Sequence, residues 1–202
     1  MSRSADRARR LIEEHGRTFA EEAGIHLTDK PSPLYRLLVL TVLLSKPISS
    51  DLAVAGARAL SQAGYRTPRR VLDATWQQRV DALGRGHYRR FDESTATILG
   101  EGAALILDRW HGDLRRLRDE GGGDPAYLMD LLQQVPGIGP TGSEIFLREV
   151  QAVWIGVRPF LDDTVLTSAE QQGLPHTARG LAATVDADDL ARLGAALVRV
   201  RG

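Results

Sequence analysis

Two short segments of the sequence carry residues whose types and spacing could do chemistry. One is the turn Pro136-Gly137-Ile138-Gly139-Pro140, whose glycines let backbone N–H groups approach an anion closely. The other is the adjacent pair of Asp162 and Asp163. A carboxylate can stabilise developing positive charge or take a proton from water. The turn therefore indicates a phosphate site, and the aspartates are candidates for acid–base chemistry.

The glycine turn has two other interpretations. Residues 137–142 formally match the dinucleotide-binding fingerprint, which requires a strand before the glycines. Residues 125–135 instead place apolar side chains at helical spacing, and no acidic residue stands at a convincing ribose position. A helix-hairpin-helix is therefore favoured, with Pro140 opening the second helix and Ile138 buried between the two helices. A plain helix-to-helix turn without a ligand is the remaining alternative.

The elements around these segments are expected to be helices. Apolar residues recur at helical spacing along most of the chain, without sustained strand-like alternation, which predicts an all-α fold. Capping side chains before proline at Ser32-Pro33, Thr67-Pro68 and Asp124-Pro125 predict helix starts near residues 33, 68 and 125. The glycine run 121–123 predicts a flexible break between helices. Further helices are expected over residues 5–15, 50–63, 75–83, 92–110, 140–151, 163–172, 177–184 and 187–199.

Composition narrows the classes of function. The 26 basic and 26 acidic side chains cancel, so any binding of nucleic acid must come from local geometry rather than from a field of the whole molecule. The absence of cysteine excludes disulfides and thiolate-ligated zinc or iron–sulfur centres. No segment has the apolar length of a membrane span, and Met1–Arg7 lack the apolar run of a signal peptide, so a cytoplasmic protein is expected.

With these motifs in hand, the chain resembles the helix-hairpin-helix DNA glycosylase superfamily, which includes endonuclease III and MutY-like proteins. Residues 32–45 resemble the first barrel helix of that family and the serine-containing turn that faces DNA. Residues 83–88 resemble its next glycine-aromatic turn, and residues 161–165 resemble the pattern around its catalytic aspartate. The resemblance spans roughly residues 32–200 and is strongest over 131–165, and the motifs occur in the order that the family has.

The resemblance implies a two-lobed all-α fold. Residues 32–151 are expected to form a six-helix barrel-like lobe that contains the hairpin at about 125–151. Residues 1–31 and 152–202 are expected to form the second lobe from the terminal helices. In the family register Asp162 takes the catalytic position, but the adjacent Asp163 also fits because Asp163-Thr164 matches the family's common Asp-Thr pair. The choice between them stays open, and the alternative for both is that they cap an ordinary helix N-terminus.

Two departures from the family restrict the implied chemistry. Lyase-type members carry a lysine just after the hairpin, where this chain has Thr141, and many members bind an iron–sulfur cluster through C-terminal cysteines that this chain lacks. The resemblance therefore implies a monofunctional DNA glycosylase of base-excision repair, which hydrolyses the N-glycosidic bond of a damaged or mispaired base. A non-catalytic DNA-binding module is the alternative. No cofactor is expected, although the hairpin carbonyls are compatible with a monovalent cation.

The expected partner is double-stranded DNA, bound by a nucleoid-associated monomer. Ordinary structural roles compete with DNA contact at several positions: solvent exposure for Lys46, helix termination for Pro47, and burial for Tyr88. The substrate base is not specified, because base selectivity depends on residues scattered over a pocket. The residues expected to contact DNA are Pro136, Gly137, Ile138, Gly139, Thr141 and Gly142 of the hairpin, Ser45, Lys46 and Pro47 of an earlier turn, and Arg85, His87, Tyr88 and Arg89.

Overall fold

The computed structural model describes residues 3–201, and its regular elements within that range are all helical. The all-α prediction is confirmed. The helices are α1 (Arg3–His15), α2 (Phe19–Glu22), α3 (Pro31–Leu44), α4 (Ser50–Gln62), α5 (Pro68–Asp73), α6 (Trp76–Arg85), α7 (Asp92–Trp110), α8 (Leu114–Gly121), α9 (Pro125–Leu132), α10 (Pro140–Val150), α11 (Asp163–Gln171), α12 (Ala178–Ala182) and α13 (Leu190–Arg199), with short 3-10 turns at Ile155–Val157 and Ala187–Asp189.

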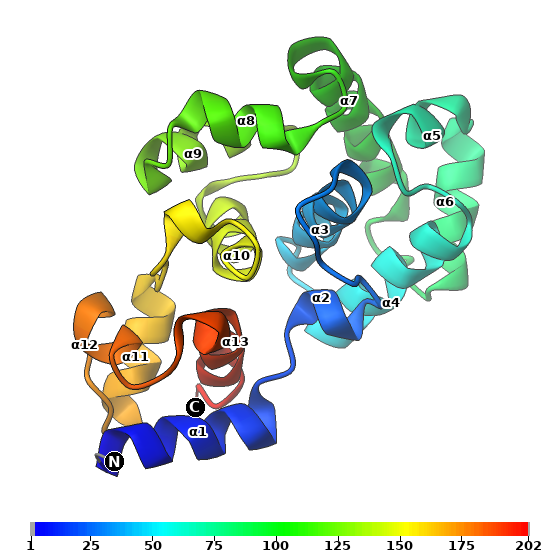
Figure 1. Ribbon diagram of the computed structural model, residues 1–202. Coiled ribbons are helices and arrows are strands. Elements are labelled where there is room, and N and C mark those ends of the chain that lie inside the picture. Colours follow the sequence, from blue (N-terminus) through cyan, green and yellow to red (C-terminus); the bar gives the residue numbers. More distant parts are fainter. Residues whose placement is uncertain (1–2, 202) are drawn as a thin grey trace.

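Helix α10 lies between two groups of helices (Figure 1). Helices α3 to α9 lie on one side of it, and α1, α11, α12 and α13 lie on the other. Helix α10 packs directly against α3, α9 and α13, so it belongs to the packing of both groups. No helix among the described residues combines the length and the apolar character needed to cross a bilayer.

The buried apolar side chains form two clusters. The larger one joins helices α2 to α10, and the smaller one joins α1, α11, α12 and α13. Helix α3 is apolar around most of its circumference because it lies inside the larger cluster. The lobe limits predicted from the sequence, 1–31 with 152–202 against 32–151, stay a prediction, because clusters of buried side chains do not by themselves define domain limits.

Capping side chains explain where several helices begin. Thr67 accepts a hydrogen bond from the Arg70 N–H at 3.3 Å, and Asp124 accepts one from the Ala126 N–H at 3.0 Å, so α5 and α9 begin at the predicted prolines. The expected start at Ser32-Pro33 is wrong by two residues. Helix α3 begins at Pro31, whose fixed φ suits the first turn, and the Ser32 hydroxyl donates instead to the Arg66 carbonyl.

Two helices, α2 and α8, are not predicted from the spacing of apolar residues, because they are short. Helix α2 is a single turn set by a capping box between Thr18 and Glu21, and α8 is capped by Asp113. The predicted break at 121–123 is a short, closely packed turn between α8 and α9. A Cβ added at Gly121 would lie 2.3 Å from the Leu128 side chain, and the two glycines that follow have positive φ. Packing and backbone conformation therefore require glycine here.

The C-terminal turn of α10 is polar although it is buried. The Glu149 carboxylate accepts the backbone N–H groups of Phe19 and Ala20, at 3.3 and 2.9 Å, and so caps the start of α2 from a distant part of the chain. Burial raises the pKa of Glu149, and the two N–H donors oppose this effect. Glu149 therefore joins the hairpin helix to the N-terminal segment.

Replacement of Glu149 by alanine should destabilise the fold. The substitution leaves two N–H groups without their acceptor in a buried place, which costs about 1–3 kcal/mol in free energy of unfolding. Urea denaturation at neutral pH measures the effect, with Glu101→Ala on the exposed face of α7 as the matched control. Equal stability of the two variants would show that Glu149 does not hold α2 in place.

Candidate nucleic-acid interface

The predicted hairpin is present between α9 and α10. Gly137 has φ of +87°, and a Cβ there would lie 2.6 Å from a side-chain carbon of Ile98 and 3.1 Å from one of Val42. Only glycine satisfies both the backbone conformation and this close approach. Ile138 is buried, as expected for the hairpin anchor. The hairpin is thus seated firmly against α3 and α7.

Gly139, Pro140 and Thr141 at the start of α10 are exposed, Gly142 is buried, and the helix lacks a side-chain cap. Gly139 occupies the N-cap position, and no acceptor within residues 3–201 pairs with the backbone N–H groups of Gly139, Thr141 and Gly142. A Cβ added at Gly139 would meet no other heavy atom within 4 Å apart from its chain neighbours. Free N–H groups and the positive end of the helix dipole favour an anion at this place.

The Ser45 turn lies beside the hairpin. A Cβ added at Gly142 would lie 2.7 Å from the Ser45 hydroxyl oxygen, which itself donates to the Thr41 carbonyl at 2.7 Å. Lys46 is half-buried and Pro47 is exposed. The structure therefore brings the turn at the end of α3 together with the first turn of α10, two of the three predicted DNA-facing segments.

The third predicted segment connects α6 with α7. Arg85, His87 and Arg89 are exposed along an open groove of about 640 Å³, which is lined only by residues of the 80–92 range and does not include the hairpin. Tyr88 is buried, and its hydroxyl pairs with the Thr95 hydroxyl at 3.1 Å. Burial also raises the pKa of Tyr88. The expectation that Tyr88 contacts DNA is therefore corrected in favour of the burial alternative.

Asp162 is the N-cap of α11. Its Oδ1 accepts the Val165 N–H at 3.1 Å, and its Oδ2 accepts Nη1 of Arg148 at 2.5 Å. The side chains of Asp162 and Arg148 are only 3% and 5% exposed, so this ion pair is shielded from water. Asp162 thus caps the N-terminus of a helix, as the alternative interpretation of the sequence expects, and its catalytic role stays a prediction. Asp163 is the first residue of α11, and it is exposed.

The segment that connects α10 with α11 folds back against the C-terminal end of α10. The side-chain amide of Gln151 makes two hydrogen bonds with the backbone of Phe160. It donates to the Phe160 carbonyl at 2.8 Å and accepts the Phe160 N–H at 3.0 Å. The Arg158 guanidinium donates to the carbonyls of Gln151 and Ala152 at 2.6 and 2.7 Å. The structure folds the segment against the end of α10, which allows Asp162 to meet Arg148.

Glu144 is a further polar residue of this region, and no motif in the sequence marks it. It lies on α10 one turn before Arg148 and is half-buried. Partial burial raises the pKa of Glu144, and the nearby charges of Asp162 and Asp163 raise it further, whereas Arg148 lowers it. One signal in the sequence could have identified Glu144. Thr141, Glu144 and Arg148 have helical spacing, which places the three residues on one face of the helix.

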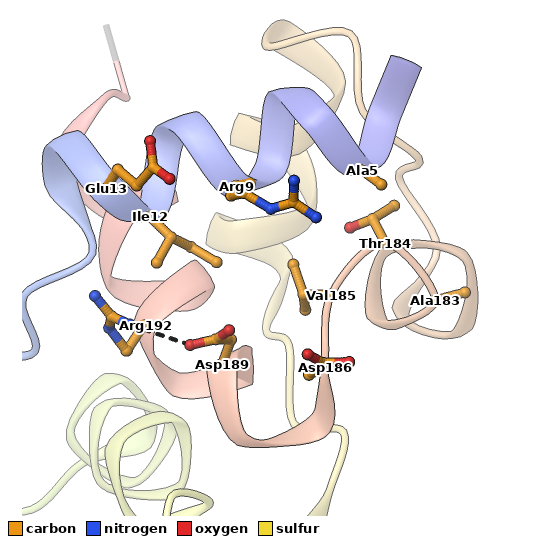
Figure 2. A pocket seen from close by; sticks show the side chains of 10 residues that line it. All are labelled: Ala5, Arg9, Ile12, Glu13, Ala183, Thr184, Val185, Asp186, Asp189 and Arg192. Carbon is orange, nitrogen blue, oxygen red and sulfur yellow. Dashed lines mark hydrogen bonds and ion pairs between the residues drawn. The ribbon is translucent and has the colours of Figure 1, made fainter. Parts of the chain in front are cut away.

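A separate cleft of about 420 Å³ lies among α1, the turn after α12 and the start of α13 (Figure 2). Charged side chains of both signs line it, including Arg192, which pairs with Asp189 at 3.2 Å. None of the site residues predicted from the sequence lines this cleft. The hairpin and the aspartates are thus not part of it.

Comparisons with known proteins identify the fold. No protein-family model matches the chain, and no curated protein matches it. Two solved structures do match. A non-covalent endonuclease III–DNA complex has a TM-score of 0.55 at 15% identity, over 98% of this chain and 85% of the other. A trapped covalent endonuclease III–DNA intermediate has a TM-score of 0.52 at 16% identity, with the same coverage. The chain therefore has the two-lobed helix-hairpin-helix fold of endonuclease III, as predicted.

Proposed function

We propose that this protein binds double-stranded DNA and hydrolyses the N-glycosidic bond of a damaged or mispaired base, as a monofunctional DNA glycosylase acting as a monomer. The observation that carries the proposal is the open, uncapped start of α10 at Gly139, held rigidly by the packing of Gly137. Such a helix start is suited to a DNA phosphate. The match to endonuclease III structures solved with DNA supports DNA binding in general.

The proposed contact with DNA is local. The chain carries no net charge, so its affinity has to come from N–H groups and a few side chains placed against the backbone. The hairpin supplies the N–H groups, and the adjacent Ser45 turn supplies Lys46. Pro47 is exposed at the same turn and could enter the gap that a flipped nucleotide leaves.

The proposed chemistry follows from the carboxylates at the start of α11. A glycosylase first flips its target nucleotide out of the duplex, at a cost of a few kcal/mol. Cleavage then develops positive charge on the sugar, which a nearby carboxylate stabilises. Thr141 stands where the lyase-type members of the resembled family carry lysine, so the chemistry proposed is hydrolysis by water and not Schiff-base formation.

A non-catalytic DNA-binding module is the second candidate, and one observation favours it. Both carboxylate oxygens of Asp162 are already engaged, one in the cap of α11 and one in the ion pair with Arg148. A carboxylate with these two bonds serves stability without any reaction. In this alternative the hairpin binds DNA in the same way, and only base release is missing.

Replacement of Gly139 by alanine tests the hairpin. The added methyl group meets no protein atom within 4 Å other than its chain neighbours, so the fold should be kept. Because the methyl group obstructs a phosphate at the N–H groups, the affinity for duplex DNA should fall about tenfold, which is about 1.4 kcal/mol. Fluorescence anisotropy at several salt concentrations measures this, and wild-type affinity should fall steeply with salt.

Gly156→Ala is the matched control, because a Cβ there is also free of contacts and the residue lies in the 3-10 turn beyond the far end of α10. Equal DNA affinity of the Gly139 and Gly156 variants, or an affinity that salt does not change, would show that the hairpin does not bind the DNA backbone.

Single-turnover incubation with labelled duplexes tests the activity. The duplexes carry uracil, alkylated, oxidised or mismatched bases and are analysed with and without alkali. A monofunctional glycosylase leaves abasic sites, so strand breaks should appear only after alkali. Asp163→Asn and Asp162→Asn are compared with wild type, and loss of the carboxylate that acts in the reaction should slow base release by about 10²-fold or more. Salt-sensitive binding without breaks in any duplex would support the non-catalytic module instead.

A further inference from the structure

One face of α10 connects the hairpin with the buried ion pair. Thr141, Glu144 and Arg148 follow one another at helical spacing, so their side chains leave the helix on the same side. Thr141 is exposed at the open start of the helix. Arg148 is buried against Asp162, with 2.5 Å between Nη1 and Oδ2. Glu144 therefore lies between the proposed phosphate site and the start of α11.

The Glu144 carboxylate is available for a reaction. Within residues 3–201 no hydrogen bond or ion pair holds its side chain, although the residue is half-buried. The charged groups that face it are Arg148 on its own helix and Asp162 and Asp163 at the start of α11. Partial burial and the two aspartates outweigh Arg148, and the pKa of Glu144 is raised. A carboxyl group with a raised pKa is a stronger base than an ordinary one.

Asp162 has the opposite environment. Its two oxygens are occupied by the Val165 N–H and by Arg148, and its side chain is 3% exposed. A carboxylate that accepts a charged hydrogen bond and caps a helix is fixed in orientation. To take a proton from water, it would have to give up one of these bonds. Asp162 is therefore suited to holding α10 and α11 together rather than to proton transfer.

We propose that Glu144 is the carboxylate that takes the proton from the attacking water, while Asp162, held by Arg148 and the Val165 N–H, keeps α10 and α11 in place. This inference rests on the proposed glycosylase activity. In the step, the water oxygen forms a bond to the sugar C1′ and its proton passes to Glu144. The bond from C1′ to the base nitrogen breaks, and its electron pair leaves with the base.

The position of Glu144 agrees with this role. The hairpin at the start of α10 would hold the DNA backbone, and Glu144 lies one turn further along the same face. The Arg148–Asp162 pair lies one more turn along, at a depth that water does not reach. Glu144 is thus the carboxylate of α10 that a nucleotide next to the hairpin would meet first, and a water molecule could reach it.

Glu144→Gln tests the inference, because it keeps the shape of the side chain and removes only the carboxylate. Single-turnover base release from the duplex that wild type processes best should slow by about 10²-fold or more. The affinity for DNA should stay equal or rise, since a negative charge is lost near the phosphates. In wild type the rate should fall as the pH drops through the raised pKa of Glu144, and this acidic limb should be absent from the Gln variant.

Glu170→Gln, at an exposed position of α11, is the matched control and should keep the wild-type rate and pH profile. Glu144→Asp keeps the carboxylate with a shorter reach and should recover part of the rate. If wild type releases base but Glu144→Gln keeps its rate and its acidic limb, the role of Glu144 is overturned and the glycosylase stands. If wild type releases no base from any duplex, the glycosylase and the role of Glu144 both fall.

Discussion

The buried ion pair between Arg148 and Asp162 is the constraint on which the site depends. It ties the helix that begins at the hairpin to the helix that begins at the aspartates, with 2.5 Å between the charged groups. Isolated charges are costly to bury, so the pair requires that α10 and α11 meet in one register. Gln151 and Arg158 fold the connection between them, and Glu149 adds the N-terminal segment. The C-terminal turn of α10 therefore holds both sides of the molecule together.

This arrangement gives one helix two ends with different tasks. The C-terminal end is buried and uses its polar side chains for internal bonds. The N-terminal end is exposed and leaves the N–H groups of Gly139 and Thr141 without internal acceptors among the described residues. Because the chain has no net charge, such a fixed local site is the means by which it can attract a phosphate. The proposed reaction would take place along the face between these two ends.

Much of the fold could be predicted from the sequence because helical periodicity and proline-linked caps are local signals. Pro125 and Pro140 mark the helices of the hairpin, and glycine at 137 reflects a positive φ that the structure confirms. Helix α2 could not be predicted, because a single turn has no apolar period and is capped in part by Glu149, far away in the sequence.

The site was less accessible to sequence reasoning because its contacts are long-range. Tyr88 has the type and neighbours of a stacking residue, but packing against Gly56 and pairing with Thr95 turn it inward. The partner of Asp162 could not be inferred, since it depends on how residues 151–160 fold back. Glu144 could not be identified for the same reason. The ion pair between Asp162 and Arg148 brings the aspartates close to the face of α10 that carries Glu144.

The most direct test of this account is a titration of isotope-labelled protein with a duplex that contains an abasic-site analogue, followed by the NMR shifts of backbone amides. Binding through the start of α10 predicts that the largest changes occur at Gly139, Thr141 and Gly142 and in the adjacent Ser45 turn, and that added salt reverses them. Changes centred instead on the cleft around Arg192, or no changes at the hairpin while DNA is bound, would contradict it.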